Sequence, residues 1–207
     1  MTTTILLIRH GQTDWNLEGR MQGHEDIPLN KTGEQQAQAL AKRLATWPIQ
    51  AIYTSDLQRS LKTAVTIGNT IGIKPIINPV WRERDLGALS GLTRTEARTQ
   101  FPKALNHRNH TKIHPPNGED HQTLQNRGLT AFRQIAATHP DQMVAVVSHG
   151  GLLHVLVAHL IGLPGGEYGR FTIRGNTGLT IAELHGDDTV VTCINDTSHL
   201  ENLNGTI

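Results

Sequence analysis

Two short apolar runs, far apart in the chain, each end in a histidine followed by a glycine. The first is Ile5–Ile8, followed by Arg9-His10-Gly11, and the second is Met143–Val147, followed by Ser148-His149-Gly150. Continuous apolar runs of this length are typical of parallel strands that are buried on both faces. Because ligands bind beyond the carboxyl ends of the strands in open α/β sheets, we expect both histidines at one edge, facing each other across a crevice.

The rest of the chain alternates between patterns of helices and strands. Capping-box spacings predict helix starts at Thr32 and Thr93, and Ser55-Asp56 reads as a helix cap. Further helices are expected over residues 57–71, about 120–138 and 152–163, and further strands over residues 49–54, 74–80, 171–173, 179–184 and 189–194. This alternation predicts an α/β fold, a three-layer αβα sandwich with a mostly parallel central sheet, and one domain over residues 1–207.

Charge and cysteine content exclude several classes of protein. The 19 lysines and arginines nearly balance the 18 aspartates and glutamates, so no nucleic-acid partner is expected. Cys193 is the single cysteine, which rules out an intrachain disulfide and a cysteine-clustered metal site. The most apolar region, 143–163, is interrupted by Ser148–Gly151, and the N-terminus lacks a secretory pattern. We therefore expect a cytoplasmic protein that has no membrane partner.

Four histidines lie close together in a polar stretch, at positions 107, 110, 114 and 121. Their spacings would fit the faces of a helix and could suggest a metal site. However, asparagine, proline and glycine residues between 106 and 118 would break such a helix, and a solvated loop is the favoured interpretation.

Four segments resemble motifs of one known family, in the same order. Leu6–Asn16 (LLIRHGQTDWN) resembles the signature of the histidine phosphatase superfamily, also called the phosphoglycerate mutase-like family. Thr54–Ser60, Trp81–Gly87 and Val146–Gly150 are similar to its later motifs, so the resemblance covers nearly the whole chain. It implies a phosphoglycerate mutase-like fold, a phosphoric monoester hydrolase activity and a phosphohistidine intermediate on His10.

The resemblance also implies a role for each matching residue. Glu83 corresponds to the general acid, Arg59 to a phosphate-binding arginine and His149 to the second catalytic histidine. The remaining residues implied in phosphate and substrate binding are Arg9, Asn16, Gln22, Gly23 and Gly150, with Asn176 matching an asparagine near the end of the sheet.

The residue types suit phosphoryl transfer. A neutral imidazole can attack phosphorus at ordinary pH, and a covalent intermediate divides one difficult displacement into two easier ones. Guanidinium groups match the charge on the phosphoryl oxygens. With Arg9, Arg59 and His149 as donors, no metal ion or other cofactor is chemically required, and none is expected.

Each candidate also has a purely structural interpretation. His10 could be the polar end of a strand, and Glu83 could belong to an exposed charge cluster. Arg59 could pair with Asp56 three residues before it, and Asn16 and Gln22 could serve loop geometry.

The branch of the family is open to two enzymatic interpretations and one non-enzymatic one. The region 91–118 is compact and the C-terminal tail is short, which favours a phosphatase of small-molecule phosphomonoesters over a bisphosphoglycerate-dependent mutase. A phosphoryl-binding regulatory module is less compatible with the five retained catalytic-type residues. Gly87–Gly91 lacks the tryptophan and glutamate common in this family, and specificity is expected from loops 21–29, 86–92 and 103–118. A homodimer is compatible with the sequence.

Overall fold

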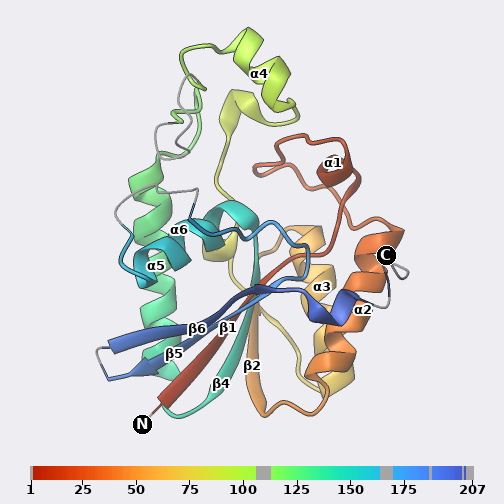
Figure 1. Cartoon of the computed structure of the whole chain (residues 1–207), viewed down its shortest axis with the longest axis vertical. Coiled ribbons are helices and arrows are strands. Elements are labelled where there is room, and N and C mark those ends of the chain that lie inside the picture. Colours follow the sequence, from red (N-terminus) through yellow and green to blue (C-terminus); the bar gives the residue numbers. More distant parts are fainter. Residues whose placement is uncertain (1, 106–112, 164–169, 187, 202, 204–207) are drawn as a thin grey trace.

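A six-stranded sheet forms the centre of the computed structural model, which describes residues 2–105, 113–163, 170–186, 188–201 and 203 (Figure 1). The strand order is β3-β2-β4-β1-β5-β6. Strands β1 to β4 run parallel, and β5 and β6 add an antiparallel edge. The strand bounds are β1 Thr2–Arg9, β2 Ile49–Thr54, β3 Ile76–Ile77, β4 Met143–Ser148, β5 Leu179–His185 and β6 Asp188–Asp196.

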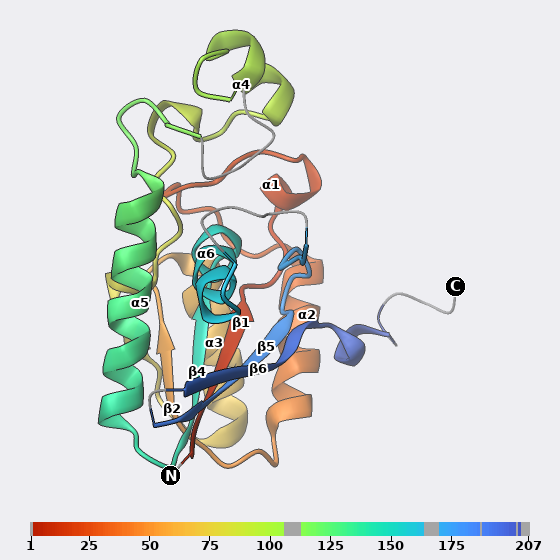
Figure 2. The same cartoon turned by 60° about the vertical axis from the view of Figure 1, so that its left-hand side comes forward.

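Helices cover both faces of the sheet, so the predicted three-layer αβα fold is confirmed. Helices α2 and α3 lie on one side of the sheet, and α5 and α6 on the other (Figure 2). The helix bounds are α1 Asp14–Leu17, α2 Lys31–Leu44, α3 Gln58–Ile71, α4 Arg94–Gln100, α5 His121–Thr138 and α6 Gly150–Leu160, with 3-10 turns at Pro79–Trp81, Gly87–Leu89 and Ser198–Leu200.

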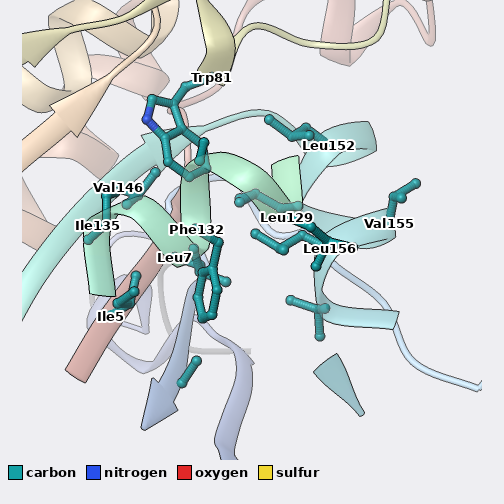
Figure 3. Close-up of a cluster of buried hydrophobic side chains, with 14 of the residues drawn as sticks. Ile5, Leu7, Trp81, Leu129, Phe132, Ile135, Val146, Leu152, Val155 and Leu156 are labelled. Atoms are coloured by element: carbon teal, nitrogen blue, oxygen red, sulfur yellow. The ribbon is translucent and has the colours of Figure 1, made fainter. Parts of the chain in front are cut away.

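The alternation of side chains along the central strands builds two cores. In β1, Ile5 and Leu7 join the cluster under α5 and α6, whereas Leu6 and Ile8 join the cluster under α2 and α3. Figure 3 shows the first cluster, in which Phe132 of α5 packs close to Ile5 and Leu7. Each fully buried aliphatic side chain of this kind contributes roughly 1.5–3 kcal/mol, which makes the strand that carries His10 a rigid support.

Helix α4 stands beyond the carboxyl edge of the sheet, at the top of Figure 1. A capping box forms at its start, as predicted: Thr93 accepts from the Glu96 backbone N–H and Glu96 accepts from the Thr93 N–H. A small core of its own supports this region, made by Leu89, Ala97, Ala104, Leu105 and Ile113.

Two predicted helix caps are wrong. Helix α2 begins at Lys31 because the Asn30 side chain, not that of Thr32, accepts from the Gly33 N–H at 2.9 Å. For α3, the carboxylate of Asp26 accepts from the Gln58 N–H at 2.7 Å. The cap of α3 therefore comes from a loop 32 residues earlier rather than from Ser55-Asp56.

Two predicted strands differ from the structure. Only Ile76–Ile77 of the stretch 74–80 pairs with β2, because Asn78 caps a 3-10 turn that starts at Pro79. Residues 171–173 form no strand and instead line a pocket described below. The hairpin β5–β6 and the helix over 121–138 agree with the prediction.

The region of the four clustered histidines is only partly described. Residues 106–112, and with them His107 and His110, lie outside the described residues. His114 is exposed in a loop and His121 begins α5. Within the described part of the chain, no three His, Cys, Asp or Glu side chains are placed to hold a metal ion, and no helix is long and apolar enough to cross a membrane.

Candidate functional site

The two histidine–glycine ends lie side by side. Strands β1 and β4 are neighbours, with Arg9 opposite Ser148, and the His10 N–H donates to the Ser148 carbonyl oxygen at 2.9 Å. The ring centroids of His10 and His149 are 5.1 Å apart, with the rings tilted. The parallel register alone accounts for this meeting of residues 139 positions apart in the chain.

The His10 ring is held with one nitrogen available for chemistry. Its Nδ1 lies 2.7 Å from the carbonyl oxygen of Gly11, which can only accept, so Nδ1 carries the proton and Nε2 has a free lone pair. Burial lowers the pKa of His10 well below its usual value, and the charges of Arg59 and Arg9 lower this pKa further. The ring is therefore a neutral imidazole at the wall of the pocket.

The turn after His10 is fixed from three sides. A Cβ on Gly11 would lie 2.5 Å from the carbonyl oxygen of Gly33, so the first turn of α2 packs directly on this glycine. The Gly11 N–H donates to Thr63 Oγ1 of α3 at 3.1 Å. The Asn176 side chain donates to the His10 carbonyl at 3.0 Å. These contacts orient the backbone of the histidine and leave its ring facing the pocket.

Arg59 is a fully buried cation in the first turn of α3. It donates from Nη1 to the Glu25 carbonyl at 2.6 Å, from Nη2 to the Gly23 carbonyl at 2.9 Å and from Nε to His149 Nδ1 at 3.3 Å. Burial lowers the pKa of Arg59 to about 10, so the group stays charged near neutral pH. The alternative pairing of Arg59 with Asp56 is wrong, because Asp56 accepts from Arg82 Nε at 2.7 Å.

His149 is engaged at both ring nitrogens. Because Arg59 Nε can only donate, Nδ1 of His149 accepts and its Nε2 donates to Ser55 Oγ at 2.7 Å. The side chain is fully buried, and burial together with the charges of Arg59 and Arg9 lowers its pKa well below the usual value. In this arrangement His149 supports Arg59 rather than lining the pocket.

Two buried polar atoms at the pocket have no hydrogen-bond partner among the described residues, Arg9 Nε and Gln22 Oε1. Arg9 also donates from Nη1 to the Arg174 carbonyl, which fixes the direction of the guanidinium. Gly150 allows its close approach, since a Cβ there would lie 3.3 Å from Arg9 Nε. A buried donor left unpaired costs about 1–3 kcal/mol, so an anionic oxygen bound beside Arg9 would relieve a cost already present.

Glu83 is held by the first turn of α6, the helix that follows His149. Its Oε2 accepts from the Gly151 N–H at 2.9 Å, and its Oε1 accepts from the Leu152 N–H at 3.1 Å and the Arg84 N–H at 2.8 Å. A Cβ on Gly151 would lie 2.4 Å from Oε1, so only glycine permits this approach. The alternative of an exposed charge cluster is therefore wrong for Glu83.

Arg127 of α5 fixes the backbone that carries Glu83, a contact that the sequence analysis missed. It donates from Nη1 to the Val80 and Arg82 carbonyls at 2.6 and 2.9 Å and from Nη2 to the Glu83 carbonyl at 2.9 Å. Its charge is balanced by Glu119, 2.7 Å from Nε. No motif marks Arg127, since its partners are carbonyl groups of a distant loop.

These elements surround a pocket of about 870 Å³. Eight of the nine candidate residues line it, all but His149: Arg9, His10, Asn16, Gln22, Gly23, Arg59, Glu83 and Gly150. Asn16 also serves loop geometry, because its Oδ1 accepts from the Thr13 N–H at 3.1 Å in a capping box. Four lining arginines were not predicted, at positions 20, 94, 170 and 174, and no periodicity or motif distinguishes them from surface arginines.

A parallel α/β sheet with paired imidazoles, buried guanidiniums and an anchored carboxylate at its carboxyl edge defines an anion-binding site of the kind found in phosphoryl-transfer enzymes. Residues 5–197 match the profile of the histidine phosphatase superfamily (branch 1). The chain belongs to this family.

Named relatives agree with this assignment. The chain is 34% identical to a metal-independent phosphoserine phosphatase of Arabidopsis thaliana, over 97% of this chain and 84% of the relative. It is 36% identical to a glucosyl-3-phosphoglycerate phosphatase of Mycolicibacterium vanbaalenii, over 77% of this chain and 75% of the relative. Among solved structures, YhfR of Bacillus stearothermophilus superposes with a TM-score of 0.90 at 36% identity, covering 96% of this chain and 100% of YhfR.

Proposed function

We propose that this chain hydrolyses small-molecule phosphomonoesters through a phosphohistidine on His10, in one domain that spans residues 1–207. The observation that carries this proposal is the His10 ring, neutral and buried, with an unprotonated Nε2, in the same pocket as the unpaired Nε of Arg9. A nucleophile and a donor for the phosphoryl oxygens thus meet in one pocket. The phosphatase relatives support the same reaction class.

In the first step, His10 Nε2 attacks phosphorus, and the bond from phosphorus to the ester oxygen breaks. Arg9 and Arg59 stabilise the charge on the phosphoryl oxygens, and the Gln22 amide supplies a further polar contact. Glu83, in its protonated form, gives its proton to the leaving alkoxide. The products of this step are the free alcohol, phosphohistidine and the Glu83 carboxylate.

In the second step, a water molecule attacks the phosphohistidine. The Glu83 carboxylate accepts a proton from this water, the bond between Nε2 and phosphorus breaks, and inorganic phosphate leaves. Neutral His10 and protonated Glu83 are regenerated. The Gly11 carbonyl keeps the proton of His10 on Nδ1 throughout, so Nε2 is the reacting nitrogen in both steps.

His149 acts in this scheme mainly by orienting Arg59, which it holds through Nδ1. Asn16, Gly23 and Gly150 shape the wall of the pocket around the phosphoryl group. No step of the scheme requires a metal ion or an organic cofactor.

The test is an assay of purified protein on p-nitrophenyl phosphate, a panel of natural phosphomonoesters, and 3-phosphoglycerate with and without 2,3-bisphosphoglycerate. We expect release of inorganic phosphate without isomerised product, and unchanged activity in EDTA. Interconversion of 3- and 2-phosphoglycerate that depends on the bisphosphate would instead establish a mutase. Loss of activity in EDTA with recovery on adding a divalent ion would contradict the metal-free scheme, and no turnover by folded protein would favour a binding module.

A further inference from the structure

The carbonyl oxygen of His10 is held by one short turn, residues 175–178, which lies just before β5. The Asn176 side chain donates to this oxygen at 3.0 Å, and the Thr177 N–H donates to it at 3.3 Å. The carbonyl belongs to the peptide unit that joins His10 to Gly11. The turn therefore sets the direction of the backbone that carries the His10 ring.

Thr177, inside this turn, has an unfavourable backbone conformation. Its φ is 55°, in the left-handed region that a β-branched residue rarely occupies. The three other non-glycine residues with positive φ in the described chain are asparagine or aspartate, which tolerate this region far better. Thr177 is also fully buried. A strained conformation of this kind persists only where surrounding contacts impose it.

The ring of His199 makes such a contact. Thr177 Oγ1 donates its single proton to the Asn176 carbonyl at 2.7 Å, so it accepts from His199 Nε2 at 2.9 Å. Burial, and then the charge of Arg43, lower the pKa of His199 to about 4, so the ring is neutral near pH 7 and carries its proton on Nε2. Its Nδ1 is buried and has no hydrogen-bond partner among the described residues. The hydrogen bond of this ring is thus directed at Thr177.

The position of His199 is fixed by α2. The ring belongs to the 3-10 turn Ser198–Leu200. Arg43 of α2 donates from Nη2 to the Asp196 carboxylate at 2.5 Å and from Nη1 to Ser198 Oγ at 3.1 Å, on either side of the start of this 3-10 turn. His199 is therefore a donor whose place is set by the body of the fold rather than by the turn that it contacts.

We propose that His199 is a positioning residue for the nucleophile: it holds Thr177 in the left-handed conformation, and the turn 175–178 in that conformation holds the His10 carbonyl. This inference rests on the proposed function, in which His10 attacks phosphorus. A misplacement of about 1 Å at a reacting group can lower a rate about 100-fold, so the effect of this contact belongs to kcat. Binding of the phosphoryl group, which depends on the guanidiniums of the pocket, changes little.

The first test is His199→Leu, with kcat measured on p-nitrophenyl phosphate and the inhibition constant of inorganic phosphate measured beside it, well below the melting temperature. We expect kcat to fall about 10- to 100-fold and the inhibition constant to change less than about threefold. The matched control is His139→Leu, because His139 is also half-buried and its Nε2 also contacts a hydroxyl, that of Tyr53 at 2.9 Å, but it does not line the pocket. This control should keep kcat within about twofold. An equal fall in the control, or a proportional loss of phosphate affinity, would indicate general destabilisation and overturn the inference.

Substitutions of Thr177 test the same contact from the other side. Thr177→Val removes the hydroxyl but keeps the branched side chain, so it should reproduce the loss of kcat even if His199→Leu folds poorly. Glycine adopts a positive φ without steric cost. In the Thr177→Gly background, His199→Leu should therefore lower kcat by no more than about twofold. The same 10- to 100-fold loss in both backgrounds would show that His199 does not act through Thr177, and the inference would be wrong.

Long-range ¹H–¹⁵N spectra of the histidine rings give a readout that does not depend on turnover, with the His10 signals assigned by their absence from His10→Ala. In the wild-type protein these signals should show a proton on Nδ1 and none on Nε2. They should shift and broaden in His199→Leu, because the Gly11 carbonyl loses its fixed direction, and stay in place in His139→Leu. Unchanged His10 signals in His199→Leu would overturn the inference. Absence of turnover by the wild-type protein would instead contradict the proposed function, and the spectra alone would then decide whether His199 positions the His10 ring.

Discussion

The ends of β1 and β4 carry the same residues, a histidine followed by a glycine, but differ in what the imidazole contacts. At the end of β1, Nδ1 of His10 donates to the Gly11 carbonyl, and Nε2 is left without such a bond in a ring that lines the pocket. At β4, His149 uses both nitrogens, on Ser55 and on Arg59, and lies behind the pocket wall. One motif thus yields a free lone pair at one strand end and a fully bonded ring at the other.

The glycines differ as well. Gly11 is needed because the first turn of α2 packs on it, whereas Gly150-Gly151 opens α6 and lets Arg9 and Glu83 approach its first turn. In the proposed scheme the β1 end therefore supplies the nucleophile, whereas the β4 end holds an arginine and a carboxylate in position. The two rings thus differ in their hydrogen bonds rather than in their motif, and the proposed roles of nucleophile and support rest on that difference.

The sharpest test of this difference is His10→Ala. We expect kcat to fall by about 10⁴-fold or more, since the variant lacks the imidazole that forms the covalent intermediate in the proposed scheme. The fold should persist, which a thermal melt and circular dichroism would check. Near-normal turnover in this variant would remove His10 from the role of nucleophile.

Glu83→Gln tests the carboxylate that the β4 end holds. The loss should be about 10²- to 10³-fold for an alkyl phosphate, whose alkoxide needs a proton, and much smaller for p-nitrophenyl phosphate. The measurement is kcat for both substrates with the same protein preparation. Equal losses on the two substrates would mean that Glu83 is not the general acid.

Substitutions of His149 test the supporting role. His149→Leu leaves Arg59 Nε and Ser55 Oγ unpaired, and we expect kcat/KM to fall about 100-fold. His149→Asn places an amide oxygen near the position of Nδ1, so it should restore about tenfold of this loss by accepting from Arg59. Ser55→Ala is the control for the other nitrogen. If Asn and Leu were equally impaired, His149 would act directly on the substrate rather than through Arg59.

The sequence allowed the sheet and the approximate position of the site to be predicted because their signals are local. Uninterrupted apolar runs mark buried parallel strands, and a polar residue with glycine at the end of each run marks the edge where ligands bind. Gly72, in the left-handed conformation at φ 77°, ends α3 where expected. The resemblance of four motifs added the residues between the two histidines.

The rest depended on contacts between distant segments. Asp26 caps α3, and Arg127 holds the backbone of Glu83. Both residues lie outside the sequence motifs that contain Arg59 and Glu83. The different roles proposed for His10 and His149 rest on hydrogen bonds to Gly11, Ser55 and Arg59, and no local sequence pattern predicts these bonds of His149. No sequence pattern distinguishes Arg94 and Arg174 from other arginines. They line the pocket because the fold brings α4 and the segment before β5 together there.

The smallest effect concerns a property that the two histidines share, burial in the neutral form. Burial lowers the pKa of both rings well below the usual value near 6.5, whereas in the unfolded chain they take up protons below that pH. The unfolded state then binds more protons, so the free energy of unfolding should decrease as pH falls from 7.5 to 5.5, by about 1 kcal/mol for each ring. His154 and His199, whose pKa values burial lowers to about 4, add to the same decrease.

Chemical denaturation at several pH values would measure this dependence. His10→Asn and His149→Asn should each flatten it by the same amount, about 1 kcal/mol over this range, even though their effects on catalysis differ greatly. His185→Asn is the control, because His185 is exposed on β5 and far from the sheet edge that holds the site.

Carboxylates with lowered pKa values, such as Asp196 at about 2, titrate below this window and do not contribute. A flattening by His10→Asn but not by His149→Asn would show that the second ring is charged in the folded protein. In that case the assignment of its Nδ1 as the acceptor from Arg59 would be wrong.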